Sequence, residues 1–123
     1  MNNREHVFIG IIIFFVYNFF NNTIINAILH PLVGISIGTM WLYGVILSVI
    51  GSGMPDVIEP AYNWTHRSRF HSKKILRFSA GIFSITAIIG LFIPGIFYIS
   101  CFFLGYMFHL LADSLTKVGL PDD

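Results

Sequence analysis

Residues 51–74, GSGMPDVIEPAYNWTHRSRFHSKK, form the only long polar stretch of an otherwise apolar chain, and they decide the fold. The stretch contains two acids, two histidines and four cations, which are Asp56, Glu59, His66, His71, Arg67, Arg69, Lys73 and Lys74. Carboxylates and neutral imidazoles each offer a lone pair to a divalent metal ion. The stretch is therefore either part of a metal site or a solvated connector between membrane helices.

The composition is typical of an integral membrane protein. Of the 123 residues, 55% are hydrophobic and 11% are charged, against about 25% charged in soluble domains. The mean hydropathy is +0.77. A net charge of +1 gives no indication of nucleic-acid binding by a basic face. The single cysteine, Cys101, excludes an internal disulfide and a CxxC metal site.

Apolar runs on both sides of the polar stretch predict an all-α fold, a bundle of about four transmembrane helices in a single domain over residues 1–123. The expected helices cover residues 6–20 (as far as 28 if the first continues), 31–53, 74–93 and 96–116, with a site loop at 54–73. Pro55 is expected to end the second helix, because proline lacks an N–H. Two interpretations of the first helix stay open. It continues through Asn21-Asn22, or these residues form a turn and Thr23 caps a short second piece.

Four spans that alternate in direction bring the start of the first, the end of the second, the start of the third and the end of the fourth to one side. All seven Lys and Arg, all six acids and four of the five histidines lie on this side. By the positive-inside rule this side is cytoplasmic. The sequence thus predicts a multi-pass membrane protein, with the lipid bilayer as a partner and the polar loop facing the cytoplasm.

The same side collects candidate metal ligands from all four spans. His109 and Asp113 are spaced i, i+4 and share one helix face, either as two ligands of one ion or as an imidazole and the acid that orients it. An ordinary helix-end hydrogen bond is the alternative. With His6 and the acids and histidines of the polar stretch, the chain offers four histidines and three carboxylates. This is enough for one or two ions, and mixed nitrogen and oxygen ligands suit zinc first, with manganese or iron also possible.

A metal with an open coordination position would activate water for hydrolysis. Glu59 is the candidate general base, because it is an acid beside the proposed ligands. Arg67 and Arg69 could bind an anionic substrate group such as phosphate. Alternatively, these two cations set the topology at the lipid headgroups.

Three segments, MPDVIEP at 54–60, HRSRFHS at 66–72 and GYMFHLLADSLT at 105–116, resemble the YdjM-like family of small prokaryotic inner-membrane proteins, which are described as metal-dependent hydrolases. The family pattern reads L-P-D, H-R-x-x-x-H-S and H-x-x-x-D-x-x-T, with an early histidine followed by glycine at plus four, as in His6 and Gly10. The resemblance implies inner-membrane localisation and the metal ligands His6, Asp56, His66, His71, His109 and Asp113. This chain departs from the pattern at Ile58, where many members carry a second acid, and Glu59 follows one residue later.

Two function classes follow from the sequence. One is a membrane-embedded hydrolase that acts on an ester or phosphoester, with an anionic or lipid-like substrate, at the cytoplasmic interface. The other is a non-catalytic membrane protein, whose structural metal or polar cluster rigidifies the bundle or docks a partner. A metal ion with an open coordination position would favour the first class. A metal ion whose four positions are all filled by protein ligands would favour the second.

Overall fold

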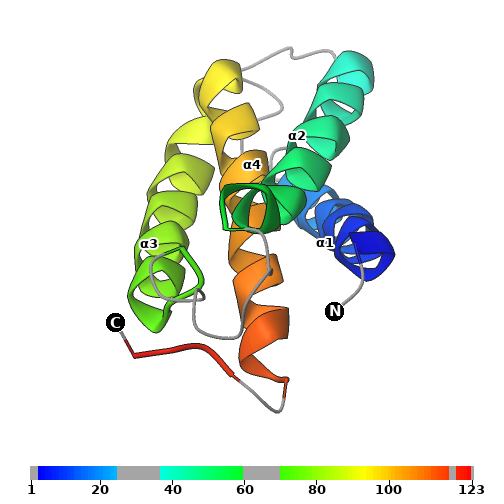
Figure 1. Ribbon diagram of the computed structural model, residues 1–123. Coiled ribbons are helices and arrows are strands. Elements are labelled where there is room, and N and C mark those ends of the chain that lie inside the picture. Colours follow the sequence, from blue (N-terminus) through cyan, green and yellow to red (C-terminus); the bar gives the residue numbers. More distant parts are fainter. Residues whose placement is uncertain (1–2, 25–36, 60–69, 117–118, 123) are drawn as a thin grey trace.

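A computed structural model describes residues 3–24, 37–59, 70–116 and 119–122. These residues form four α-helices and no strand: α1 (Asn3–Ile24), α2 (Ile37–Ile58), α3 (Lys73–Gly90) and α4 (Pro94–Ser114) (Figure 1). The predicted all-α class is confirmed. Within the described ranges, one helix is long and apolar enough to cross a membrane, over Gly95–Ser114, and α2 contributes a shorter apolar stretch over Leu42–Ile58.

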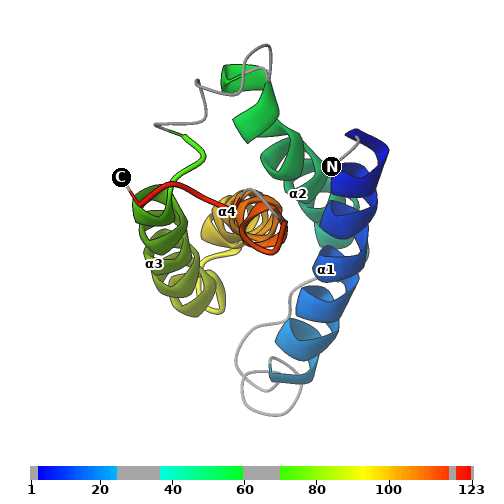
Figure 2. The same cartoon turned by 60° about the horizontal axis from the view of Figure 1, so that its bottom comes forward.

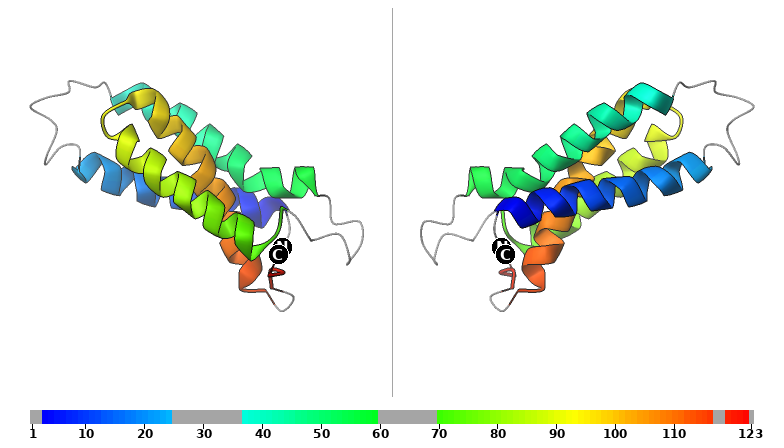
Figure 3. Two further views of the ribbon diagram at one scale, coloured as in Figure 1. Left: turned by 90° about the vertical axis from the view of Figure 1, so that its left-hand side faces the viewer. Right: turned by 90° about the vertical axis from the view of Figure 1, so that its right-hand side faces the viewer.

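Helix α4 is the central element of the bundle and packs against each of the other three helices. Figure 2 shows α3 on one side of α4, with α2 and α1 on the other. Successive helices run in alternating directions, so the two chain termini lie at the same end of the molecule (Figure 3). The start of α1, the end of α2, the start of α3 and the end of α4 meet there.

Helix α2 continues past Pro55, so the prediction that the proline ends it and that a loop begins at residue 54 was wrong. Pro55 cannot donate to the carbonyl of Gly51, and one helical hydrogen bond is lost. The next turn still forms, because the N–H of Glu59 donates to the carbonyl of Pro55 at 2.9 Å. The buried proline ring is also held by packing. The extra turn carries Asp56 into the bundle end.

Helix α1 runs through Asn21-Asn22 to Ile24. The continuous helix is therefore confirmed, and the turn with a Thr23 cap is wrong. The Thr23 hydroxyl instead donates to the carbonyl of Phe19 at 2.8 Å, as threonine does inside a helix. Residues 25–28 and 31–36, which the predicted first and second helices also included, lie outside the described residues.

The third and fourth helices lie close to their predicted bounds, with α3 at 73–90 against the expected 74–93 and α4 at 94–114 against 96–116. The hydroxyl of Ser72 caps α3 by accepting from the N–H of Ile75 at 3.3 Å. Pro94 occupies the first turn of α4, where its missing N–H costs no helical hydrogen bond.

Small residues line the contact between α2 and α4. Gly51 lies against the backbone carbonyl of Phe102, and Gly105 lies against the backbone carbonyl of Ser48, so neither position has room for a Cβ. Large apolar side chains are instead exposed on every helix, including Phe8, Phe15, Phe19, Ile46, Ile50, Phe78, Ile85, Ile88 and Ile99. The core also contains large apolar side chains, such as Phe14, Phe97 and Leu110. The many exposed ones nevertheless differ from a water-soluble bundle, whose outward faces are mainly polar.

The C-terminal segment returns to the start of α3. The N–H of Lys73 donates to the carbonyl of Pro121 at 2.9 Å, and its ammonium group pairs with Asp122 at 2.6 Å. Leu120 is buried in a cluster with side chains of α4. The return therefore links the end of α4 to the first residue of α3.

Alanine substitutions at two glycines of α2 test the close approach of α2 and α4. We expect Gly51→Ala to destabilise the protein by about 1 to 3 kcal/mol, because the new methyl group meets the Phe102 carbonyl and the backbone cannot rotate away. Gly53→Ala is the matched control, since nothing lies within 4 Å of a Cβ there. It should be neutral or stabilising by up to about 1 kcal/mol. Thermal unfolding in detergent measures the difference, and equal melting temperatures would contradict the close approach.

Candidate metal centre

Side chains from three helices and from the segment before α3 meet at one end of the bundle. Ring nitrogens and carboxylate oxygens within this group lie 3.2 to 3.7 Å apart. The structure thereby brings together five of the six ligands that the sequence suggested: His6 of α1, Asp56 of α2, His71, and His109 and Asp113 of α4.

Two other residues with predicted roles, His66 and Arg67, lie outside the described residues, as does Arg69. The assignment of His66 as a ligand stays a prediction. The same holds for Arg67 and Arg69 as binders of an anionic group.

The most deeply buried part of the cluster is a triad of His71, His109 and Asp113, each at most 2% exposed. Nε2 of His109 lies 3.3 Å from Nε2 of His71 and 3.2 Å from Oδ2 of Asp113. The third side, from His71 Nε2 to Asp113 Oδ2, measures 3.7 Å. Ligand atoms about 2.0 to 2.2 Å from a tetrahedral zinc ion lie roughly 3.3 to 3.6 Å from one another. The triad therefore has the size of one face of a coordination tetrahedron.

The ring of His109 is oriented by the main chain of α2. Its Nδ1 lies 2.6 Å from the carbonyl oxygen of Ser52. A carbonyl only accepts, so Nδ1 carries the proton and donates. Nε2 then has a free lone pair that is directed at His71 and Asp113. The sequence could not reveal this contact, because the acceptor is a backbone atom brought close by the packing of α2 on α4.

The ring of His71 is oriented by Glu59. Its Nδ1 lies 3.3 Å from Oε2 of Glu59, and its Nε2 lies 3.3 Å from Oδ1 of Asp56. A carboxylate on the outer nitrogen of an imidazole holds the inner nitrogen ready as a ligand. Glu59 therefore lies behind His71, and this geometry favours an orienting role over the general-base role that the sequence suggested.

The surroundings of His71 favour a positive charge. Burial alone lowers the pKa of this imidazole, but the hydrogen bonds to Asp56 and Glu59 and the charge of Asp113 outweigh burial, and the pKa is raised above its ordinary value. The carboxylates that stabilise a proton here would stabilise a metal cation at the same nitrogen.

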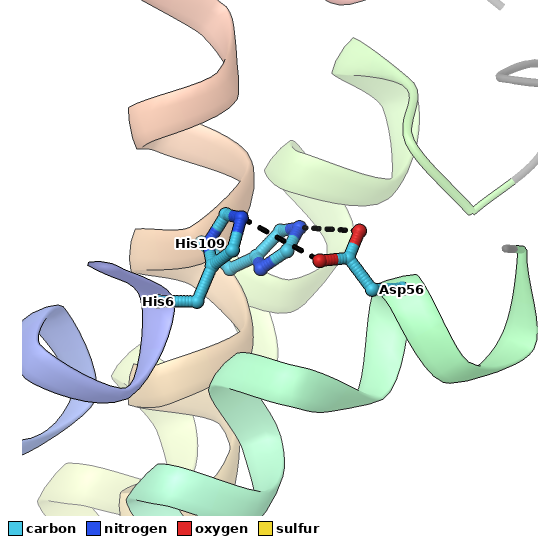
Figure 4. Close-up of side chains that lie close together, drawn as sticks. All are labelled: His6, Asp56 and His109. Carbon is cyan, nitrogen blue, oxygen red and sulfur yellow. Dashed lines mark ion pairs between the residues drawn. The ribbon is translucent and has the colours of Figure 1, made fainter. Parts of the chain in front are cut away.

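His6 and Asp56 form the second part of the cluster (Figure 4). The His6 ring stacks on His109, with centroids 3.8 Å apart and an interplanar angle of 20°. Its Nε2 lies 3.5 Å from Oδ2 of Asp56. The Asp56 side chain is 30% exposed, against 4% for His6 and 0% for His109. Asp56 is thus the ligand candidate most open to solvent among the described residues.

Gly10 explains how His6 reaches the cluster. It lies one turn after His6, and a Cβ at this position would come within 2.8 Å of the Ser52 hydroxyl oxygen. The Ser48 hydroxyl also donates to the Gly10 carbonyl at 3.0 Å. A histidine followed four residues later by glycine therefore seats α1 on α2 and places the His6 ring over His109.

Comparisons with known proteins gave no match among protein-family models, curated proteins or solved structures. The fold and the cluster by themselves define a class: a helical protein that has, in its described ranges, one candidate membrane span and buried His/Asp groups that could hold a metal ion. Two such groups are present within the described residues, His6–Asp56–His109 and His71–His109–Asp113, and they share His109.

Substitution of Glu59 tests its position behind His71. We expect Glu59→Ala to weaken zinc binding about 10- to 100-fold, because loss of an orienting carboxylate frees the ligand ring. Glu59→Gln should lose less zinc affinity, since its amide oxygen still accepts a hydrogen bond from His71. Asp122→Asn, an exposed carboxylate change at the same end, is the control. Competition with a fluorescent zinc chelator measures the affinities, and unchanged zinc binding in Glu59→Ala would exclude the orienting role.

Proposed function

We propose that this chain is a multi-pass membrane protein that binds a divalent transition metal ion, zinc first, and hydrolyses an ester or phosphoester at the cytoplasmic membrane interface. The observation that carries the proposal is the pair of Nε2 atoms of His71 and His109, which face each other at 3.3 Å. The hydrolytic reaction and the inner-membrane placement rest additionally on the resemblance of three segments to the YdjM-like family.

The facing nitrogens need a cation between them. Both Nδ1 atoms are occupied, that of His109 by the Ser52 carbonyl and that of His71 by Glu59. Both Nε2 atoms of the neutral rings therefore present lone pairs, and the carboxylate of Asp113 adds negative charge beside them. A proton on one nitrogen would form a hydrogen bond with only one of the other two groups. A divalent ion would satisfy the two nitrogens and the carboxylate together, in the geometry that zinc adopts.

Asp56 lies where it can take part in the proposed hydrolysis. A divalent ion held by the triad would act as a Lewis acid and supply a water nucleophile at neutral pH. Asp56 lies beside both histidine nitrogens, with Oδ1 at 3.3 Å from His71 and 3.6 Å from His109. Its partial exposure puts it on the side from which a substrate and water approach. With one ion in the triad, we assign to Asp56 the proton acceptance that the sequence had suggested for Glu59. Bound to two ions, Asp56 would serve as a ligand only.

Two features support insertion of all four helices in a bilayer. The helices contain 18 to 22 residues, which corresponds to about 27 to 33 Å against a hydrocarbon core of about 30 Å. Their outward faces carry large apolar side chains, and their contacts use glycine and serine, as lipid-embedded helices do. Lys73, Lys74 and Arg77 lie in the first turns of α3, at the end that holds the site. Their position supports a cytoplasmic site.

A structural metal is the second candidate function. It is favoured because the residues of the cluster come from different elements, so that one ion would link α4 to α2 and to the segment before α3. In that case the ion would raise stability and no hydrolysis would follow.

Hydrolysis assays with defined metal loading separate the two candidates. We expect zinc- or manganese-loaded protein in detergent to cleave at least one probe among p-nitrophenyl phosphate, bis-p-nitrophenyl phosphate and p-nitrophenyl esters. Chelation and His109→Ala should each lower the rate by at least about 100-fold, since a metal supplies several kcal/mol of transition-state stabilisation. Gly53→Ala should keep the wild-type rate. A metal-dependent rise in melting temperature without cleavage of any probe would favour the structural metal.

A further inference from the structure

We infer that the cluster holds a second metal ion, between His6 and Oδ2 of Asp56, so that the Asp56 carboxylate bridges two ions. This inference rests on the proposed first ion in the triad of His71, His109 and Asp113. It concerns a different pair of ligand atoms, and it can fail while the first ion stands.

The first step is that His109 can serve one ion only. Its Nδ1 donates to the Ser52 carbonyl at 2.6 Å, so Nε2 is its single ligand atom. That atom lies 3.3 Å from His71 Nε2 and 3.2 Å from Asp113 Oδ2, within the triad. The group of His6, Asp56 and His109 therefore cannot use the His109 nitrogen for an ion of its own. A second ion must rely on His6 and Asp56.

The second step is that the two oxygens of Asp56 face different partners. Oδ1 lies 3.3 Å from Nε2 of His71 and 3.6 Å from Nε2 of His109. Oδ2 lies 3.5 Å from Nε2 of His6. Figure 4 shows the stacked His6 and His109 rings facing the carboxylate, with one dashed line from each oxygen to one of the rings. A carboxylate that divides its oxygens in this way can bind one ion through each of them.

The third step is that His6 is buried and that Asp56 contacts only one of its two ring nitrogens, Nε2. It is 3% exposed, and its Nδ1 has no hydrogen-bond partner among the described residues. If the proton is on Nε2, the Nδ1 lone pair meets no donor. If the proton is on Nδ1, that N–H meets no acceptor and the Nε2 lone pair faces the Asp56 carboxylate. In the second arrangement the Nε2 lone pair and the Asp56 carboxylate repel each other at 3.5 Å. A cation next to Nε2 and Oδ2 would remove this repulsion, because both atoms then become ligands, while Nδ1 keeps its proton.

A second ion would also narrow the reaction class. Two ions bridged by a carboxylate stabilise the attacking and the leaving oxygens of an in-line displacement, as in many phosphatases and nucleases. The inference therefore favours the phosphoester over the carboxylic ester among the substrates proposed above.

Metal stoichiometry tests the inference directly. After saturation with Mn²⁺ or Zn²⁺ and removal of free metal, mass spectrometry of the detergent-purified protein should give about two ions per chain. His6→Phe should reduce the ratio to about one, because phenylalanine keeps the ring that stacks on His109 but has no ligand nitrogen. Gly53→Ala should keep both ions. The Mn²⁺-loaded wild type should show the electron paramagnetic resonance signal of a spin-coupled pair, a readout that needs no variant.

Three other outcomes would overturn the inference. One ion per chain in the wild type, unchanged in His6→Phe and without spin coupling, leaves the single-ion proposal intact and reduces His6 to a partner of Asp56. Two uncoupled ions, both retained in His6→Phe, place the second ion elsewhere. A wild-type chain without metal removes both the second ion and the proposed function.

Discussion

The hydrogen bond from His109 Nδ1 to the carbonyl of Ser52, at 2.6 Å, is the contact on which the rest of the site depends. It exists because α2 and α4 approach until Gly51 and Gly105 touch the opposite backbone. It fixes the tautomer of His109 and turns Nε2 toward His71 and Asp113. The same close packing of α2 on α4 therefore orients the candidate ligand atom at the end of the bundle.

A cation would stabilise the cluster for an electrostatic reason. Two carboxylates and two imidazole lone pairs are directed at one buried volume, and each uncompensated charge in such surroundings is costly. Protonation of His71 relieves part of this cost, in line with its raised pKa. Metal and proton therefore compete for the same nitrogen, and metal affinity should fall as the pH falls.

The sequence predicted those parts of the structure that follow from local patterns. The i, i+4 spacing of His109 and Asp113, and the alternation of four apolar runs, were enough to predict that distant candidate ligands meet at one end. The role of Glu59 was not predictable, because it requires α2 to continue beyond Pro55, against the usual effect of proline. The Ser52 carbonyl gave no signal either, since any residue has one. Gly10 was noted as part of a pattern, and its steric reason became visible only with α1 seated on α2.

X-ray absorption at the metal edge of the zinc-loaded protein tests the central claim most directly. The account predicts a first shell of nitrogen and oxygen at about 2.0 to 2.2 Å, with outer-shell scattering from at least two imidazoles. His109→Ala should lose part of that imidazole signal. A spectrum of fully hydrated zinc, or a first shell that contains sulfur from Cys101, which is buried in a separate core cluster, would contradict the account.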